Sequence, residues 1–323
     1  MPNRWLTVPL LVLMPFVARA GLGLAREATS DERLSRVLAP ALALAAWLVA
    51  VHTTGLVTHS FYAGLGVGTA IVAASSVALA RRGKPAAAIA GPGASEVASA
   101  PALWMWAGAA AAMAILAGPE IFYAKHDECL IVGHLSLPAE MLNGVYPPRH
   151  LAFPSFELRY HYGTDLLTAA VSALLGRLDV RFTLHALTLL LWGYSFVLFW
   201  VLGERLIGGR ASGPITATCV LFAGGAPYFC RPLDPIVPYL TSDCREAGIW
   251  ITPPFVSSFL QHPWTLGMPL FGAALLLVVH FGSDLPAVRG AAVLALVVVG
   301  LALAQAVLFV CLVPCLVVTG AFE

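Results

Sequence analysis

Long apolar runs constrain this chain more than any other feature of its sequence. Of its 323 residues, 59% are hydrophobic and 11% are charged, whereas soluble domains carry roughly 25% charged residues. Several runs approach or reach the ~20 apolar residues that a helix needs to cross a bilayer. The sequence therefore predicts an all-α, polytopic transmembrane helical bundle. A net charge of +1 without a basic stripe argues against a nucleic-acid partner.

The apolar runs predict about eight to nine spans and a multi-pass topology. The predicted spans are 5–24, 37–57, 65–80, 103–123, 184–202, 215–222, 264–281 and 291–318, the last being one long span or a tight pair. The first run also resembles a signal peptide, because a basic residue precedes its apolar core. Glycines in the run 64–68 are expected to let helices pack closely.

Basic loops set the predicted orientation. The positive-inside rule places 26–36, 81–84 and 203–210 in the cytoplasm, so the fourth span leads to the outside. This requires an external amino terminus, which conflicts with the basic residue Arg4.

The chain divides into two predicted regions. Residues 1–101 would form amino-terminal transmembrane segments and a flexible cytoplasmic loop. Residues 102–323 would form a transmembrane core with outer loops at 124–183 and 224–262. Because the chain ends directly after an apolar run, truncation at the carboxy terminus remains open.

The polar stretch 120–165 is the predicted site, because it holds four of the nine histidines and many charges beside an apolar segment. Ionisable groups near a bilayer are costly unless they have a partner or a function. The apolar piece that follows, 165–176, would reach only about 18 Å as a helix, too short to span. It is predicted to lie in the membrane interface.

Two adjacent acids, Asp127 and Glu128, come first in this stretch. They could act as a carboxylate base or as a metal-ligand pair, or they could be solvated acids at a helix end. Lys125 and His126 adjoin them and are candidate substrate contacts. The histidines have no zinc-site spacing, so no structural metal is predicted, while a divalent-cation cofactor remains open.

Basic residues follow a Tyr-Pro-Pro turn: Arg149, His150, Arg159 and His161. Guanidinium groups pair bidentately with phosphate, so recognition of a phosphate or pyrophosphate is one interpretation. Contact with lipid headgroups, or pairing with nearby acids such as Asp165, is the other. His262 could face the same cavity as the acid pair, or it could anchor a helix at the interface. His52 and His280 lie in predicted spans and are interpreted as packing residues.

The order of short motifs resembles a known family. The motifs are Lys-His-Asp-Glu at 125–128, Tyr-Pro-Pro at 146–148, Leu-Gly at 175–176, Val-Arg-Phe-Thr-Leu at 180–184 and Gly-Glu-Arg-Leu-Ile-Gly-Gly-Arg at 203–210. Their order is similar to that in the GT-C superfamily of integral membrane glycosyltransferases. In particular, the order resembles that in protein O-mannosyltransferases and in aminoarabinose transferases that act on lipid A. The resemblance covers about a third of the chain, 103–222.

The resemblance implies hexosyl or pentosyl transfer from a polyprenyl-phosphate donor to a glycan, lipid or protein acceptor on the outer face of the membrane. It implies that Asp127 is the catalytic base, with Glu128 beside it in the motif. The substrate-binding candidates are Lys125, His126, Arg149, His150, Arg159, His161, Asp165 and His262. The composition, rich in Ala, Leu and Val, favours a bacterial inner membrane, whose lipids would also contact the chain. The chain departs from the family by three extra apolar segments before the acid pair and by lacking later spans.

Other classes of protein remain open. A transporter or lipid flippase would show paired charges at the bilayer midplane and internal repeats, and the sequence shows neither. A non-catalytic membrane subunit, or a fragment of a larger enzyme, is the other alternative.

Overall fold

The computed structural model describes residues 4–81, 133–149, 160–176, 179–209, 211–222, 263–281 and 288–321, with a few single residues between them. Within these ranges the chain forms ten helices and no β-strand. The all-α prediction is therefore confirmed for the part of the chain that the structure describes.

Five of the described helices are long and apolar enough to cross a membrane. They are α1 (Arg4–Ala28), α2 (Glu32–Thr58), α3 (Phe61–Arg81), α7 (Val180–Ile207) and α12 (Pro263–Phe281). The shorter helices are α5 (Ser136–Leu142), α6 (Gly163–Leu174), α8 (Ser212–Phe222), α13 (Val288–Ala304) and α14 (Ala306–Ala321). The chain thus has the helices of a membrane-embedded protein.

Several sequence predictions fall outside the described residues. The loop 82–101 and the boundary at 101–102 do so, as do the outer loop 224–262, parts of the first outer loop and nearly all of the span 103–123. The total of eight to nine spans therefore stays a prediction. The interfacial position of the predicted short helix, now α6, also stays a prediction. Its 12 residues are mostly buried against other helices.

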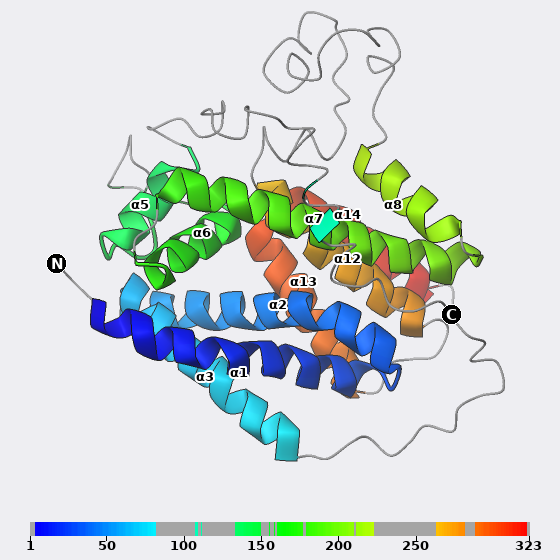
Figure 1. Cartoon of the computed structure of the whole chain (residues 1–323), viewed down its shortest axis with the longest axis horizontal. Helices are drawn as coiled ribbons and strands as arrows, with labels where there is room; N and C mark the ends of the chain where they lie inside the picture. Colours follow the sequence, from blue (N-terminus) through cyan, green and yellow to red (C-terminus); the bar gives the residue numbers. More distant parts are fainter. Residues whose placement is uncertain are drawn as a thin grey trace, which may run out of the picture.

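The helices form two packed groups joined by α13. Helices α1, α2 and α3 pack against one another, and α7 packs against α8 and α12. Helix α13 contacts both α2 and α12, so it lies between the groups (Figure 1). The short helices α5 and α6 lie together at one end of the bundle, near the start of α7.

Small residues let α2 and α3 approach closely. A Cβ built on Gly64 would lie 2.6 Å from the Gly55 Cα, and one on Gly68 would lie 2.7 Å from the Val51 Cα. A Cβ on Gly66, which lies between them in sequence, would meet nothing within 4 Å. Residues four apart share one helix face, so Gly64 and Gly68 form the contact surface. This confirms the interpretation of the glycine-rich run.

A tyrosine from α7 bonds to the backbone of α2 beside a proline. Pro40 has no N–H to donate within the helix. Next to this proline, the Tyr194 hydroxyl donates to the Val37 carbonyl at 2.7 Å and accepts from the Ala41 N–H at 3.0 Å. The hydroxyl therefore occupies a place in the hydrogen-bond ladder of α2 and ties the two helix groups together.

Ion pairs gather at the end of the bundle where α1 meets α2. They join the α1–α2 turn to the end of α7 and to the start of α13: Arg33–Glu204 at 2.7 Å, Arg289–Glu27 at 2.9 Å, and Arg205–Asp31. Burial raises the pKa of Asp31, but hydrogen bonds from the Leu34 N–H and Arg205 outweigh it, and the net pKa is lowered. The loops 26–36 and 203–210, both predicted to be cytoplasmic, thus share one end of the bundle.

The glycine contact predicts opposite effects for two alanine substitutions in α3. Gly64→Ala should lower the free energy of unfolding by about 2 kcal/mol, because the methyl group overlaps the α2 backbone. Gly66→Ala should raise it by up to about 1 kcal/mol, because alanine favours the helix and the site is open. Both can be measured by SDS titration of detergent-solubilised protein, followed by circular dichroism. Equal effects of the two substitutions would contradict this packing.

Candidate functional site

The segment 133–149 is fixed to the end of α2 that lies opposite the ion pairs. The Tyr62 hydroxyl of α3 donates to the Leu142 carbonyl at 2.7 Å. The Tyr146 ring packs on Gly55, where an added Cβ would lie 2.7 Å from a ring carbon. The absence of a side chain at Gly55 therefore makes room for the aromatic ring that anchors this segment.

The segment 160–176 enters the same end of the bundle through α6. Gly163, the first residue of α6, approaches α13 so closely that an added Cβ would lie 2.7 Å from the Leu303 carbonyl oxygen. Asp165 follows in the first turn of α6 and is fully buried. The fold thus brings a carboxyl group into the interior of the bundle.

A buried histidine pairs with that carboxyl group. His134 Nδ1 lies 2.8 Å from Asp165 Oδ1, and the two side chains are 5% and 0% exposed. With Asp165 as a carboxylate, Nδ1 donates, so the bond fixes both the tautomer and the orientation of the imidazole. Among the described residues, no donor lies within hydrogen-bond distance of Asp165 Oδ2. Half of this buried carboxylate is thus left for a further partner.

Two more rings complete the polar cluster. The Tyr160 ring stacks on His161, with centroids 4.1 Å apart, and lies 5.9 Å from the His134 ring. Burial and the nearby His134 lower the pKa of His161, while Asp165 partly raises it. The His161 imidazole is therefore mostly neutral at pH 7. We call His134, Tyr160, His161 and Asp165 the polar cluster.

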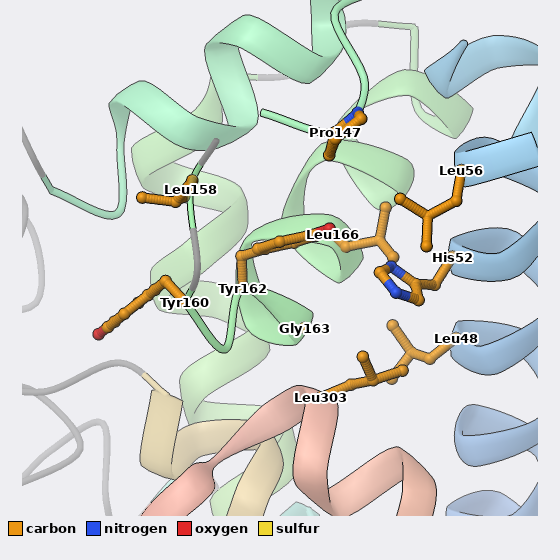
Figure 2. A pocket seen from close by; sticks show the side chains of 10 residues that line it. All are labelled: Leu48, His52, Leu56, Pro147, Leu158, Tyr160, Tyr162, Gly163, Leu166 and Leu303. Atoms are coloured by element: carbon orange, nitrogen blue, oxygen red, sulfur yellow. The ribbon is translucent and has the colours of Figure 1, made fainter. Parts of the chain in front are cut away.

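A cavity of about 290 Å³ adjoins the polar cluster, with Tyr160 lining it (Figure 2). This volume is near the lower end of the ~300–1,000 Å³ typical of small-molecule pockets. The apolar part of its wall comes from five leucines on four parts of the chain: Leu48, Leu56, Leu158, Leu166 and Leu303. The wall of the cavity is thus mostly apolar, and the polar cluster lies next to it.

Three hydrogen-bonding side chains line or back this cavity. His52 Nδ1 lies 2.7 Å from the Tyr146 hydroxyl, and the Tyr162 ring packs edge-on against the Tyr146 ring with centroids 6.2 Å apart. Burial raises the pKa of both tyrosines. Both phenols therefore stay protonated near neutral pH and serve as hydrogen-bond partners rather than as bases.

Three of the ten candidate residues lie within the described ranges. The structure brings His161 and Asp165 together in the polar cluster. Arg149 is exposed after the Tyr-Pro-Pro turn, and its N–H donates to the Glu140 carboxylate at 2.9 Å. The roles of the other seven stay predictions, because they lie outside the described residues: Lys125, His126, Asp127, Glu128, His150, Arg159 and His262. Within the described ranges, no group of three or more His, Cys, Asp or Glu could hold a metal ion.

The sequence analysis does not select His134, Tyr160, Tyr162 or His52 as site residues. His134 lies in the predicted polar stretch, but its partner is 31 residues away. His52 was interpreted as a packing residue, whereas its ring lines the cavity. His52 could have been selected from the sequence, because a histidine inside a predicted span is costly without a partner.

No protein-family model, curated protein or solved structure matches this chain.

The polar cluster predicts how one substitution changes the titration of His161. Asp165→Asn removes a nearby negative charge that favours protonated His161, so the pKa of His161 should fall further. Histidine-selective NMR of the detergent-solubilised protein would measure it. Asp179→Asn, the same change at an exposed helix cap, should leave the titration unaltered. An unchanged or higher pKa in Asp165→Asn would contradict the placement of the two side chains.

Proposed function

We propose that this protein is an integral membrane glycosyltransferase that moves a sugar from a polyprenyl-phosphate donor to a hydroxyl acceptor on the outer face of a bacterial inner membrane. The observation that carries the proposal is that a polar side-chain pair and an apolar cavity lie next to each other. A buried His134–Asp165 pair lies beside a leucine-walled cavity at one end of a bundle of apolar helices. A lipid-linked sugar is likewise polar at one end and apolar at the other.

The two ends of the bundle support a position for the site on the outer side of the membrane. The basic loops 26–36 and 203–210 meet at one end through ion pairs. The polar cluster lies toward the other end, where α2 finishes at Thr58 and α3 begins. Because basic loops favour the cytoplasm, this arrangement supports an outer position for the site.

The chemistry proposed for the site is an inverting displacement. The acceptor hydroxyl attacks the anomeric carbon, its proton passes to a carboxylate, and the carbon–oxygen bond to the lipid phosphate breaks. The phosphate leaves with the bonding electron pair. Asp127 is the proposed base, from the motif that it shares with the GT-C superfamily.

The described residues suit supporting roles in that reaction. Asp165 orients His134, as a carboxylate orients a functional imidazole in many sites. The side chain of Arg149 is exposed, so it is available to neutralise the phosphate. Neutral His161 can donate or accept a hydrogen bond beside Asp165 without adding charge.

The proposal predicts the effect of three Asp→Asn substitutions on sugar transfer. Asp127→Asn should lower turnover about 100-fold or more, because the base is lost. Asp165→Asn should lower it by about 10- to 100-fold through the misoriented His134. The control Asp179→Asn should retain wild-type turnover, because asparagine also caps a helix.

The assay uses the full chain in lipid nanodiscs with a panel of radiolabelled polyprenyl-phosphate hexoses and pentoses. Membrane extract supplies the acceptors, and folding of each variant is checked by circular dichroism. Wild-type turnover in both Asp127→Asn and Asp165→Asn would contradict the proposed site. Failure of the wild-type chain to transfer any sugar of the panel would contradict the proposed function.

A further inference from the structure

A cluster of three side chains lies between α2 and the cavity and has no role in the proposed reaction. It consists of His52, Tyr146 and Tyr162, and His52 Nδ1 lies 2.7 Å from the Tyr146 hydroxyl. The three rings also contact one another, with centroid separations of 5.7–6.2 Å. Tyr146 and Tyr162 are 4% and 8% exposed. These polar groups are thus held rigidly in an apolar wall.

The protons of His52 and Tyr162 decide what the cavity can bind. A neutral imidazole has one nitrogen that donates and one that accepts. With Nδ1 donating to the Tyr146 hydroxyl, the Nε2 lone pair of His52 is left as an acceptor. The Tyr162 hydroxyl, which also lines the cavity, supplies a donor.

Both groups face the cavity. Figure 2 shows the His52 imidazole projecting from α2 between Leu48 and Leu56, and the Tyr162 ring pointing toward α2. Tyr160 lines the same cavity but points the opposite way. The cavity therefore presents one donor and one acceptor close together, as a single hydroxyl group requires.

The rest of the wall selects against charged ligands. None of the described lining residues is Asp, Glu, Lys or Arg, and five are leucines. A phosphate or carboxylate here would lose its hydration without gaining a charged partner, which is costly. A neutral hydroxyl on an apolar chain would satisfy both polar groups and fill the apolar space.

The cavity lies close to the end of α2, at the level where the headgroup of a membrane lipid joins its chain. His52 lies six residues before the end of α2 at Thr58, which is about 9 Å along the helix axis. Leu303 closes the cavity near the end of α13. An alcohol group at this depth lies just below the headgroup region, with its chain among the helices or lipids.

We propose that this cavity is a binding site for the hydroxyl end of a neutral lipid alcohol. Tyr162 donates a hydrogen bond to the alcohol oxygen, and His52 Nε2 accepts the alcohol proton. This is the leucine-walled cavity named in the proposed function, but the binding of an alcohol to it does not depend on sugar transfer.

The test uses a photoreactive long-chain primary alcohol, with a diazirine in its chain, and the full protein in nanodiscs. After irradiation, mass spectrometry should find the label on peptides from α2 and from residues 160–176. A probe with the same chain but no hydroxyl should label wild-type protein about fivefold less. Tyr162→Phe and His52→Phe should each reduce labelling by the alcohol to a similar extent.

Tyr160→Phe is the matched control, because it removes a hydroxyl from the same loop that points away from the cavity. It should keep wild-type labelling by the alcohol, and labelling by the hydroxyl-free probe should be equal in Tyr162→Phe and wild type. Equal labelling of wild-type protein by the two probes would overturn the proposal. So would an equal loss in Tyr160→Phe and Tyr162→Phe.

Discussion

The seating of the Tyr146 ring on Gly55 is the contact on which the rest of the site depends. Gly55 offers the ring a bare stretch of α2, and Gly64 of α3 approaches the same glycine from another side. The ring places the Tyr146 hydroxyl 2.7 Å from His52 Nδ1 and packs against the Tyr162 ring. One residue without a side chain thus joins the helix pair, the polar segment and the cavity.

The two ends of the bundle differ in how their charged side chains are paired. At the α1–α2 end, arginines and acids from separate loops pair with one another, which ties α1, α2, α7 and α13 together. At the other end, the buried Asp165 has one imidazole partner, and its second oxygen has no donor among the described residues. Paired charges stabilise a structure, whereas a carboxylate that is only partly satisfied is typical of a functional site. This contrast supports placing the chemistry at the second end.

Features that depend on neighbouring residues could be predicted from the sequence. The length of an apolar run indicates a helix, and glycines four apart, such as Gly64 and Gly68, mark one helix face. His161 and Asp165 were chosen because they share one polar stretch. Pairs that only the fold brings together could not be predicted. His134 and Asp165 are 31 residues apart, and His52 and Tyr146 are 94 apart. No periodicity in the sequence encodes such distant pairs.

The most direct test determines on which side of the membrane the polar stretch 120–165 lies. Cys129 adjoins the acid pair, and the other five cysteines can be replaced by serine. A membrane-impermeant thiol reagent should label Cys129 in intact cells. A cysteine introduced at the exposed Ser30, in the α1–α2 turn, should be labelled only after the membrane is opened. The reverse pattern would place the polar stretch inside and would contradict sugar transfer on the outer face.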